Sequence, residues 1–507
     1  MSKAQGRSAG IAALLFLSIA VVAARAGAAA PPERTHDIVP EDYFTQGFIG
    51  DLALSPDGRL VAFTDLRWDL DADTRHTDVW VADVKTHEMR RLTFHPANDG
   101  RPLWSADGRW VYFTSARGEE DDRPPLNGKT QVWKAPAGGG EPVPVTRFKE
   151  GVDDYALSDD GRTLYYVKSS EAVEDPWKEM KEKFDDLEYG QGVMNYSEVW
   201  SLDLETWRTE KLVDEDRVVR QFAVSPGGDR IAMITTPDEE AITNEGLSRV
   251  DVWDRKTKSV ATVPDKLWRE DAPSPYGWLE GLAWSADGAD LAFRVDFDGY
   301  PSELLVAHFD GAEVRPHRLV REGEFSLGGD PTMRWLGGDL CFLSEEKARV
   351  RVARIRDIRP GGQGRYEILT PGDWVAKGFA ISADGRTLAA ALGDVTQPND
   401  VFVTSLGGKP KLERVTRINP QVDTWKLPEI RIVKWAGARG DTVEGILELP
   451  FDYQPGTKLP LHLALHGGPS DADRYYFEYW IYGRGLWPTL GWAVFAPNYR
   501  GSTGFGD

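Results

Sequence analysis

The sequence predicts a seven-bladed all-β propeller over residues 44–416, followed by the first part of an α/β domain over residues 420–507. Three observations support this prediction. A short phrase of the form Ser-x-Asp-Gly recurs along the chain at intervals of about fifty residues. Each copy is followed by segments in which apolar and polar residues alternate. Beyond residue 420 this pattern gives way to an apolar segment, a glycine-rich loop and a second apolar segment.

The composition is that of a globular, acidic protein. The 507 residues include 60 Lys and Arg against 81 Asp and Glu, which gives a net charge of −21. Binding to nucleic acid requires clustered positive charge, so we expect no nucleic-acid partner. The one cysteine, Cys341, allows no internal disulfide and no cysteine-based zinc site. We expect no metal and no cofactor, and the sequence carries no signal for the oligomeric state.

The first 28 residues have the order of a secretory signal peptide. Lys3 and Arg7 precede an apolar run over residues 11–24, and small residues follow up to Ala28. We therefore expect cleavage after Ala28 and export to the periplasm or the medium. The alternative is an uncleaved membrane anchor. No later segment approaches the 18 or so apolar residues that a membrane span needs, so we expect no stable membrane insertion after cleavage.

The repeated phrase predicts a β-hairpin in every copy. A turn of the Pro-Asp-Gly kind separates an apolar segment from an alternating one, and a second alternating pair follows, as in residues 78–93 and 400–416. Two hairpins make a four-stranded propeller blade, so seven copies predict seven blades. A terminal blade without the phrase would change the count by one. The last glycines of the copies are Gly58, Gly108, Gly161, Gly228, Gly288, Gly338 and Gly385. The copies that end at Gly228 and Gly338 are degenerate, with Ser-Pro-Gly-Gly and Trp-Leu-Gly-Gly in place of Ser-x-Asp-Gly.

Two features within the repeats have competing interpretations. Trp104, Trp284 and Trp335 stand in the phrase, where the strand pattern favours core between blades over a surface that stacks a ligand. The insertion at residues 171–197 predicts a short helix over Trp177 to Leu187. We interpret this insertion as a solvated excursion, and the alternative is that its acidic residues meet the amino terminus of a substrate.

The C-terminal part predicts a mixture of strands and a helix. Residues 429–449 resemble a hairpin, and the continuous apolar run from Pro460 to Leu465 is typical of a strand buried on both faces. Within this run we expect His462 to be a satisfied core residue. Aromatic and aliphatic residues between Arg474 and Leu490 have helical spacing, although the glycines and proline there weaken or end the helix.

Two motifs in this part carry a family resemblance. His466-Gly-Gly-Pro469 and Asn498-Tyr-Arg-Gly-Ser-Thr-Gly-Phe-Gly506, placed after a propeller with Ser-Pro-Asp-Gly phrases, resemble the prolyl oligopeptidase family, closest to its acylaminoacyl-peptidase-like and dipeptidyl-peptidase-like branch. The resemblance implies that residues 420–507 are the N-terminal part of an α/β-hydrolase domain. It also implies a serine-type peptidase whose substrates are short peptides, because the propeller limits entry.

The His-Gly-Gly-Pro loop suits the oxyanion hole of such an enzyme. Acyl transfer needs hydrogen-bond donors aimed at the oxygen that becomes negative, and glycines let the backbone approach it closely. By resemblance, Gly468 would supply a backbone N–H, and His466 stands where some relatives carry an oxyanion-hole tyrosine. The alternative is that Gly467 and Gly468 only make a tight turn. For Arg500 to Gly506 we favour a structural role.

The catalytic triad of the family would lie beyond these motifs, in the order Ser, Asp, His. The sequence has one Gly-x-Ser-x-Gly match, Gly6-Arg-Ser-Ala-Gly10, which lies in the signal peptide and is a chance match. Ser502 lacks the elbow pattern and is no substitute. We therefore assign no catalytic residue and expect this chain to be inactive as given. We also expect an open apolar edge at Leu465, so that residues 420–507 alone would be unstable or prone to aggregate.

Two further functions remain open. One is a propeller-based binding protein with a vestigial hydrolase stub, which would need no nucleophile. The other is an esterase on the same hydrolase core, because an oxyanion loop serves ester and amide substrates alike.

Overall fold

The computed structural model describes most of the chain after the predicted signal peptide. The described residues are 33–119, 123–172, 178–184, 195–297, 299–311, 313–320, 325–362, 364–438, 440–468, 471–479 and 483–505. The predicted signal peptide lies outside them. Among the described residues, no helix is both long and apolar enough to cross a membrane.

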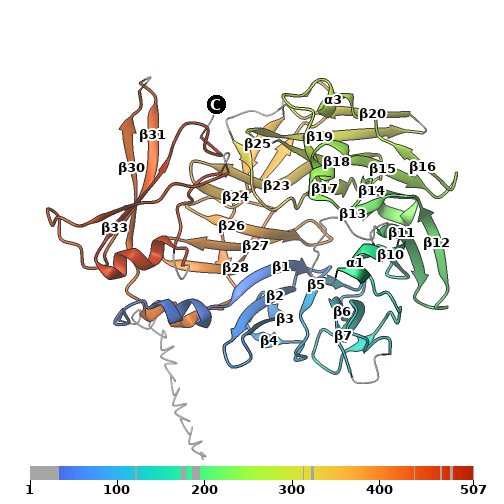
Figure 1. Cartoon of the computed structure of the whole chain (residues 1–507), viewed down its shortest axis with the longest axis horizontal. Coiled ribbons are helices and arrows are strands. Elements are labelled where there is room, and N and C mark those ends of the chain that lie inside the picture. The colour runs from blue at the N-terminus through green and yellow to red at the C-terminus, as the bar shows by residue number, and fades with distance from the viewer. Residues whose placement is uncertain are drawn as a thin grey trace, which may run out of the picture.

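Five four-stranded antiparallel sheets follow one another along the chain in the order of their strands (Figure 1). The first consists of β1 (Phe48–Leu54), β2 (Leu60–Asp69), β3 (Thr74–Asp83) and β4 (Met89–Arg91). The second consists of β5 (Asp99–Trp104), β6 (Trp110–Ser115), β7 (Gln131–Pro136) and β8 (Val143–Pro144). The third consists of β9 (Asp154–Leu157), β10 (Thr163–Ala172), β11 (Asn195–Asp203) and β12 (Thr209–Asp214). The fourth consists of β13 (Val218–Val224), β14 (Arg230–Thr236), β15 (Arg249–Asp254) and β16 (Ser259–Thr262), and the fifth of β17 (Trp278–Trp284), β18 (Asp290–Phe297), β19 (Tyr300–Asp310) and β20 (Glu313–Arg318).

A sheet of nine strands completes the propeller. Two antiparallel groups make it up, and one parallel bridge between Val350 and Val375 joins them. Whether this sheet counts as one blade or two decides the blade count, so seven blades stay a prediction. Its strands are β21 (Ser326–Leu327), β22 (Arg334–Leu336), β23 (Asp339–Glu346), β24 (Arg349–Arg356), β25 (Arg365–Ile368), β26 (Val375–Ile381), β27 (Thr387–Asp394), β28 (Gln397–Ser405) and β29 (Glu413–Arg414).

Helices are short and lie in the connections. They are α1 (Lys178–Lys183), α2 (Ala241–Leu247), α3 (Lys266–Arg269) and the 3₁₀ helices η1 (Pro40–Thr45), η2 (Pro226–Gly228), η3 (Pro420–Thr424) and η4 (Arg484–Leu490). The helix α1 falls within the predicted Trp177 to Leu187 segment, of which the remaining residues lie mostly outside the described part.

The repeated phrase forms the tight turn that the sequence predicts. In the first copy, the Ser55 hydroxyl donates to Asp57 and accepts from the backbone N–H of Leu60, at 2.7 and 2.9 Å. Gly58 adopts a φ of 68°, which a residue with a Cβ atom rarely tolerates. The same serine-to-aspartate bond recurs at Ser105, Ser158, Ser285 and Ser382. Local side-chain chemistry therefore sets the hairpins.

The three phrase tryptophans link neighbouring sheets, as their sequence pattern predicts. The indole N–H of Trp104 donates to Ala53 of the first sheet at 3.0 Å. The equivalent bonds of Trp284 and Trp335 reach Ala223 and Ala283 of the preceding sheets, at 3.1 and 2.9 Å. Each tryptophan thus adds one hydrogen bond to the apolar packing between sheets.

The first and last propeller sheets pack against each other and close the ring (Figure 1). Strand β1 lies beside β26, and Val61 and Phe63 share one apolar core with Ala389 and Val401. The side chain of Asn419 completes the closure through two hydrogen bonds to the backbone of Gly47.

A separate four-stranded sheet follows the propeller, in the order β30-β31-β33-β32. Its strands are β30 (Glu429–Ala436), β31 (Thr442–Leu449), β32 (Leu461–Leu463) and β33 (Ala493–Asn498). The hairpin predicted at residues 429–449 is β30–β31, and β32 runs parallel to β33. Strand β32 lies at one edge of the described sheet, with Leu463 and the following Leu465 55% and 64% exposed. The segment is therefore not buried on both faces and has the open apolar edge expected at Leu465. His462 is only partly buried and stacks on Trp487, with ring centroids 4.9 Å apart.

The helix predicted between Arg474 and Leu490 is wrong over its first part. Residues 471–479 have no regular secondary structure, and only η4 is helical. The backbone N–H groups of this segment bond elsewhere: Tyr475 donates to Ala348 and Phe477 to Asp394, at 2.8 and 2.9 Å. Contacts with the propeller therefore replace the hydrogen bonds that a helix would need.

Candidate active site

The two C-terminal motifs meet at the carboxyl ends of β32 and β33. These strands are parallel neighbours, so the loop after each one leaves the sheet at the same edge. The loop after β32 carries His466 and Gly468, and the turn after β33 carries Tyr499 and Ser502. In open α/β sheets, ligands bind at this edge.

His466 is held by the second motif. Its Nε2 atom lies 2.8 Å from the Ser502 hydroxyl, and its ring stacks on that of Tyr499 with centroids 4.4 Å apart. The Tyr499 hydroxyl donates to the His466 carbonyl at 2.7 Å. The Arg-Gly-Ser-Thr-Gly turn thus fixes the first loop.

Serine next to histidine suggests a nucleophile and its base, but the surroundings of this pair do not suit catalysis. Ser502 is only 2% exposed, so a substrate carbonyl cannot approach its Oγ atom. The other ring nitrogen, Nδ1, lies 3.0 Å from the carbonyl oxygen of Gly467, with no carboxylate bonded to it among the described residues. A catalytic histidine is normally oriented by an acid at this position. The pair therefore serves to position the loop.

The glycines of the first loop leave their amides available. Gly468 has a φ of 135°, in the region that favours glycine. Among the described residues, the N–H groups of Gly467 and Gly468 donate no hydrogen bond. Unpaired backbone donors on a glycine loop are the groups from which an oxyanion hole is built. The structure thus places both predicted site residues, His466 and Gly468, on one loop, and their role in an oxyanion hole stays a prediction.

The propeller contacts the loops that leave this edge of the sheet. Arg474 binds Glu345 of β23 at 3.0 Å and Asp471 of its own segment at 3.2 Å. Burial raises the pKa of Glu345, and the Arg474 charge opposes the shift. The backbone of Gly504 bonds to Lys347 and to the Ser326 hydroxyl, at 2.9 and 3.0 Å. The loops at the carboxyl edge are therefore docked on the strands β21 to β24.

A buried ionic cluster lies behind the loops. Arg484 bridges Glu448 of β31 and Asp473, at 3.2 and 3.1 Å. Burial raises the pKa of Glu448 to about 7 and also raises the pKa of Asp473, against the pull of Arg484 in both cases. The Asn498 side chain exchanges two hydrogen bonds with the Asp473 backbone, at 2.8 and 2.9 Å. The end of β33 is thereby tied to the loop after β32.

A metal-dependent site finds no support in the part of the chain that the structure describes. No three His, Cys, Asp or Glu side chains gather there in a way that would hold a metal ion.

The partners of His466 could not be identified from the sequence. Ser502 stands 36 residues away, and its motif was expected to be structural, which agrees with its position. The Arg-Gly-Ser-Thr-Gly motif was the available signal in the sequence. The motif does not indicate which residue its serine contacts.

The chain is similar in sequence and in fold to several peptidases, although no family model matches it. An uncharacterized peptidase of Bacillus subtilis, YuxL, is 22% identical over 90% of this chain and 70% of its own length. Dipeptidyl-peptidase 5 of Porphyromonas endodontalis is 22% identical over 97% of this chain and 72% of its own length. The solved structure of Pyrococcus horikoshii acylaminoacyl peptidase has a TM-score of 0.67 at 15% identity and covers 93% of this chain and 68% of its own. The chain therefore has the fold of a propeller-bearing peptidase over nearly all of its length, and both of these relatives are peptidases by name.

Proposed function

We propose that the chain carries the propeller and the first strands of the catalytic domain of a serine-type peptidase of the prolyl oligopeptidase family, acting on short peptides. One observation carries the proposal: the His466–Gly468 loop presents two glycine amides that donate no hydrogen bond to any described residue, at the carboxyl edge of a parallel strand pair. The names of the relatives and the shared fold support it. The second part of the proposal, an α/β-hydrolase sheet behind a seven-bladed propeller, rests on the same evidence.

The position of the loop beside the propeller supports short peptides as substrates. The propeller strands β21 to β24 dock on the same loops, through Arg474, Gly504 and Tyr475. Gly467 and Gly468 are themselves exposed beside these docked segments. In the proposal, the neighbouring propeller limits access to Gly468 to short flexible peptides.

We also propose that these 507 residues do not hydrolyse peptides on their own. Triad chemistry needs an exposed nucleophile with an oriented base, and Ser502 is buried. A fluorophosphonate probe should therefore leave every serine of the purified chain unlabelled. Stoichiometric labelling of one serine would overturn this part.

The nucleotide sequence that follows the codon for Asp507 tests the peptidase assignment itself. We expect Gly-x-Ser-x-Gly there, followed by Asp and His, and hydrolysis of dipeptidyl or acylaminoacyl amides by the extended protein. In that protein Gly468→Ala should lower kcat about 100-fold or more, because a side chain at a φ of 135° displaces the amide. Gly456→Ala is the matched control, since Gly456 also has a positive φ, 93°, in a remote turn. Equal activity of the two variants would contradict the oxyanion role.

We also propose that the protein is exported and that residues 1–28 are removed. The charged, apolar and small-residue order of the N-terminus supports this. Amino-terminal sequencing of the protein from a periplasmic fraction should begin at Ala29. Recovery of the intact N-terminus from a membrane fraction would favour an anchor instead.

A further inference from the structure

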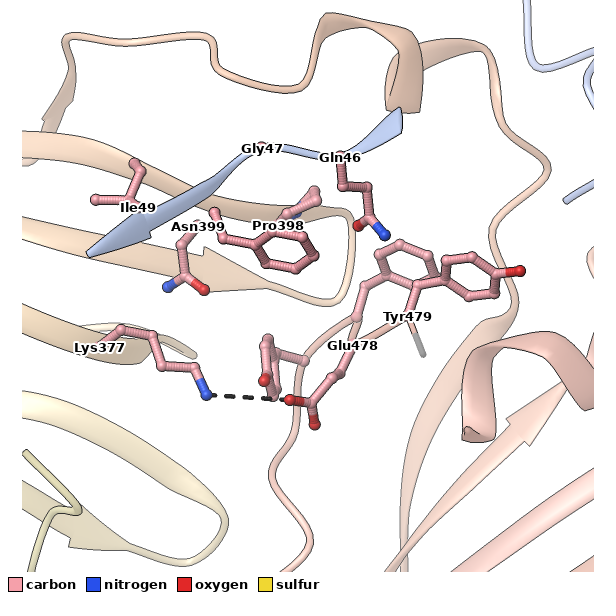
Figure 2. Close-up of a pocket in the computed structure, with 11 residues that line it drawn as sticks. Gln46, Gly47, Ile49, Lys377, Pro398, Asn399, Glu478 and Tyr479 are labelled. Carbon is pink, nitrogen blue, oxygen red and sulfur yellow. Dashed lines mark ion pairs between the residues drawn. The ribbon is translucent and has the colours of Figure 1, made fainter. Parts of the chain in front are cut away.

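A cavity lies between the start of the propeller and the segment that follows the His466 loop (Figure 2). Its volume is about 190 Å³. An apolar cavity of about 150 Å³ holds benzene, so this one has the size of a single amino acid and not of an oligopeptide. Phe48 and Pro398 of the propeller form one wall, and Phe477 and Tyr479 form another.

A positively and a negatively charged side chain lie at one side of the cavity and form no direct hydrogen bond with each other. The Lys377 ammonium and the Glu478 carboxylate are 4.0 Å apart, beyond hydrogen-bond length (Figure 2). Among the described residues, no acceptor lies within hydrogen-bond length of the Lys377 ammonium, which lies 5.3 Å from the centroid of the Tyr476 ring, and the Tyr476 hydroxyl is hydrogen-bonded to Glu478. Their side chains are 45% and 33% exposed, so a small molecule can reach the gap.

A buried amide provides the second observation. Gln46 is 3% exposed, and its Nε2 atom has no hydrogen-bond partner among the described residues. Figure 2 shows its carboxamide directed toward the cavity. A buried donor without a partner is unfavourable, and this one leaves part of the cavity lining polar.

We propose that this cavity binds a free α-amino acid with an apolar side chain. The ligand ammonium would bind Glu478 and the ligand carboxylate would bind Lys377, which places four alternating charges in a ring across the 4.0 Å gap. Both charged groups of an α-amino acid are bonded to the same carbon atom, whereas the terminal charges of a peptide lie farther apart. The apolar side chain would lie against Phe48 and Phe477.

The inference does not depend on peptidase activity. It requires only the cavity and the Lys377–Glu478 pair with its 4.0 Å gap, both of which belong to the chain as it stands. A failure to bind an amino acid therefore leaves the proposed function untouched, and the reverse also holds.

The test uses L-leucine as the probe and isothermal titration calorimetry on the full chain. We expect a Kd below about 1 mM. N-acetyl-L-leucine, which lacks the ammonium, and L-leucinamide, which lacks the carboxylate, should each bind about tenfold or more weakly, since each loses a charged hydrogen bond. No binding of leucine at this level, or equal binding of all three compounds, would overturn the proposal.

Two variants locate the site. Glu478→Gln and Lys377→Met each keep most of the side-chain shape and should weaken leucine binding about tenfold or more. Lys426→Met is the control, because it removes an ion pair with Asp37 elsewhere on the chain. Circular dichroism confirms that each variant is folded, and the ligand analogues test the proposal without any variant. Binding that survives both cavity substitutions unchanged would place the ligand elsewhere and overturn the proposal.

Discussion

The bond between His466 and Ser502 joins the two loops of the candidate site, and its loss is measurable. Ser502→Ala removes the hydroxyl that lies 2.8 Å from Nε2 of His466, inside a site that is 2% exposed. We expect a loss of about 1–2 kcal/mol in the free energy of unfolding, because the ring nitrogen keeps no replacement partner. Urea denaturation measures it. The control is Ser405→Ala, which removes an exposed hydroxyl 3.4 Å from an amide and should change stability by less than about 0.5 kcal/mol. Equal values for the two variants would contradict a positioning role.

Glu448 should make the stability depend on pH. Its folded pKa is about 7, whereas an unfolded glutamate titrates near pH 4.3. Between these values the folded protein holds a proton that the unfolded chain has released, so the free energy of unfolding falls as the pH rises. Glu448 is 2% exposed, so the effect is not screened by solvent, and it amounts to about 3 kcal/mol between pH 5 and 8.

The comparison variant for this prediction is Glu448→Gln, which stays neutral. Denaturation at pH 5 and pH 8 should show the unsubstituted chain losing about 3 kcal/mol more than the variant over this interval. Glu429→Gln, an exposed position on the neighbouring strand β30, should keep the full pH dependence. An unchanged pH dependence in Glu448→Gln would show that Glu448 does not carry the effect.

At the scale of elements, the sequence predicts what local chemistry decides. The hairpin turns follow from Ser55, Asp57 and Gly58 and their later copies, because these residues bond to their own neighbours. The helix at residues 474–479 fails for the opposite reason: the N–H groups of Tyr475 and Phe477 bond to the distant propeller residues Ala348 and Asp394.

The candidate site likewise has one part that the sequence predicts and one part that it does not. The glycine loop with His466 and Gly468 is predictable because its motif is contiguous in the sequence. The contact between His466 and Ser502 is not, since it depends on β32 and β33 being parallel neighbours. Strand order likewise decides the burial of Leu463, which apolarity alone predicted incorrectly.

The edge strand β32 should cause self-association. It pairs only with β33 within the described sheet, and its Leu463 side chain is 55% exposed. An exposed apolar edge offers unpaired backbone groups to a second chain, and a charge placed there blocks such pairing. Leu463→Lys should therefore reduce the light scattered by concentrated protein. Leu70→Lys is the control, because Leu70 is 61% exposed but lies in the turn after β2. If both variants scatter light alike, the edge is not the associating surface.

At the scale of the whole molecule, the propeller ring closes through an apolar core and two hydrogen bonds of one side chain. The first sheet meets the last through the core that Val61 and Phe63 share with Ala389 and Val401. At one end of this seam, Asn419 accepts from the Gly47 N–H at 2.7 Å and donates to the Gly47 carbonyl at 2.9 Å. A Cβ atom on Gly47 would lie 2.4 Å from Asp65, so only glycine permits this close approach. The two hydrogen bonds of Asn419 thus join the ends of the ring, as backbone hydrogen bonds join neighbouring strands within a sheet.

Asn419→Ala should weaken the whole ring and not one sheet alone. The substitution leaves the buried N–H and carbonyl of Gly47 without partners, so we expect a loss of about 2–4 kcal/mol in the free energy of unfolding. Asn98→Ala is the matched control, because Asn98 accepts from the Thr77 N–H at an exposed position and should cost less than about 0.5 kcal/mol. Hydrogen exchange distinguishes unfolding of the whole ring from local opening of the seam. If the ring unfolds as one unit, amides of β2 and of β14 lose equal protection in Asn419→Ala. Faster exchange confined to β1 and β26 would show that the seam opens locally, and that each sheet is stable without closure.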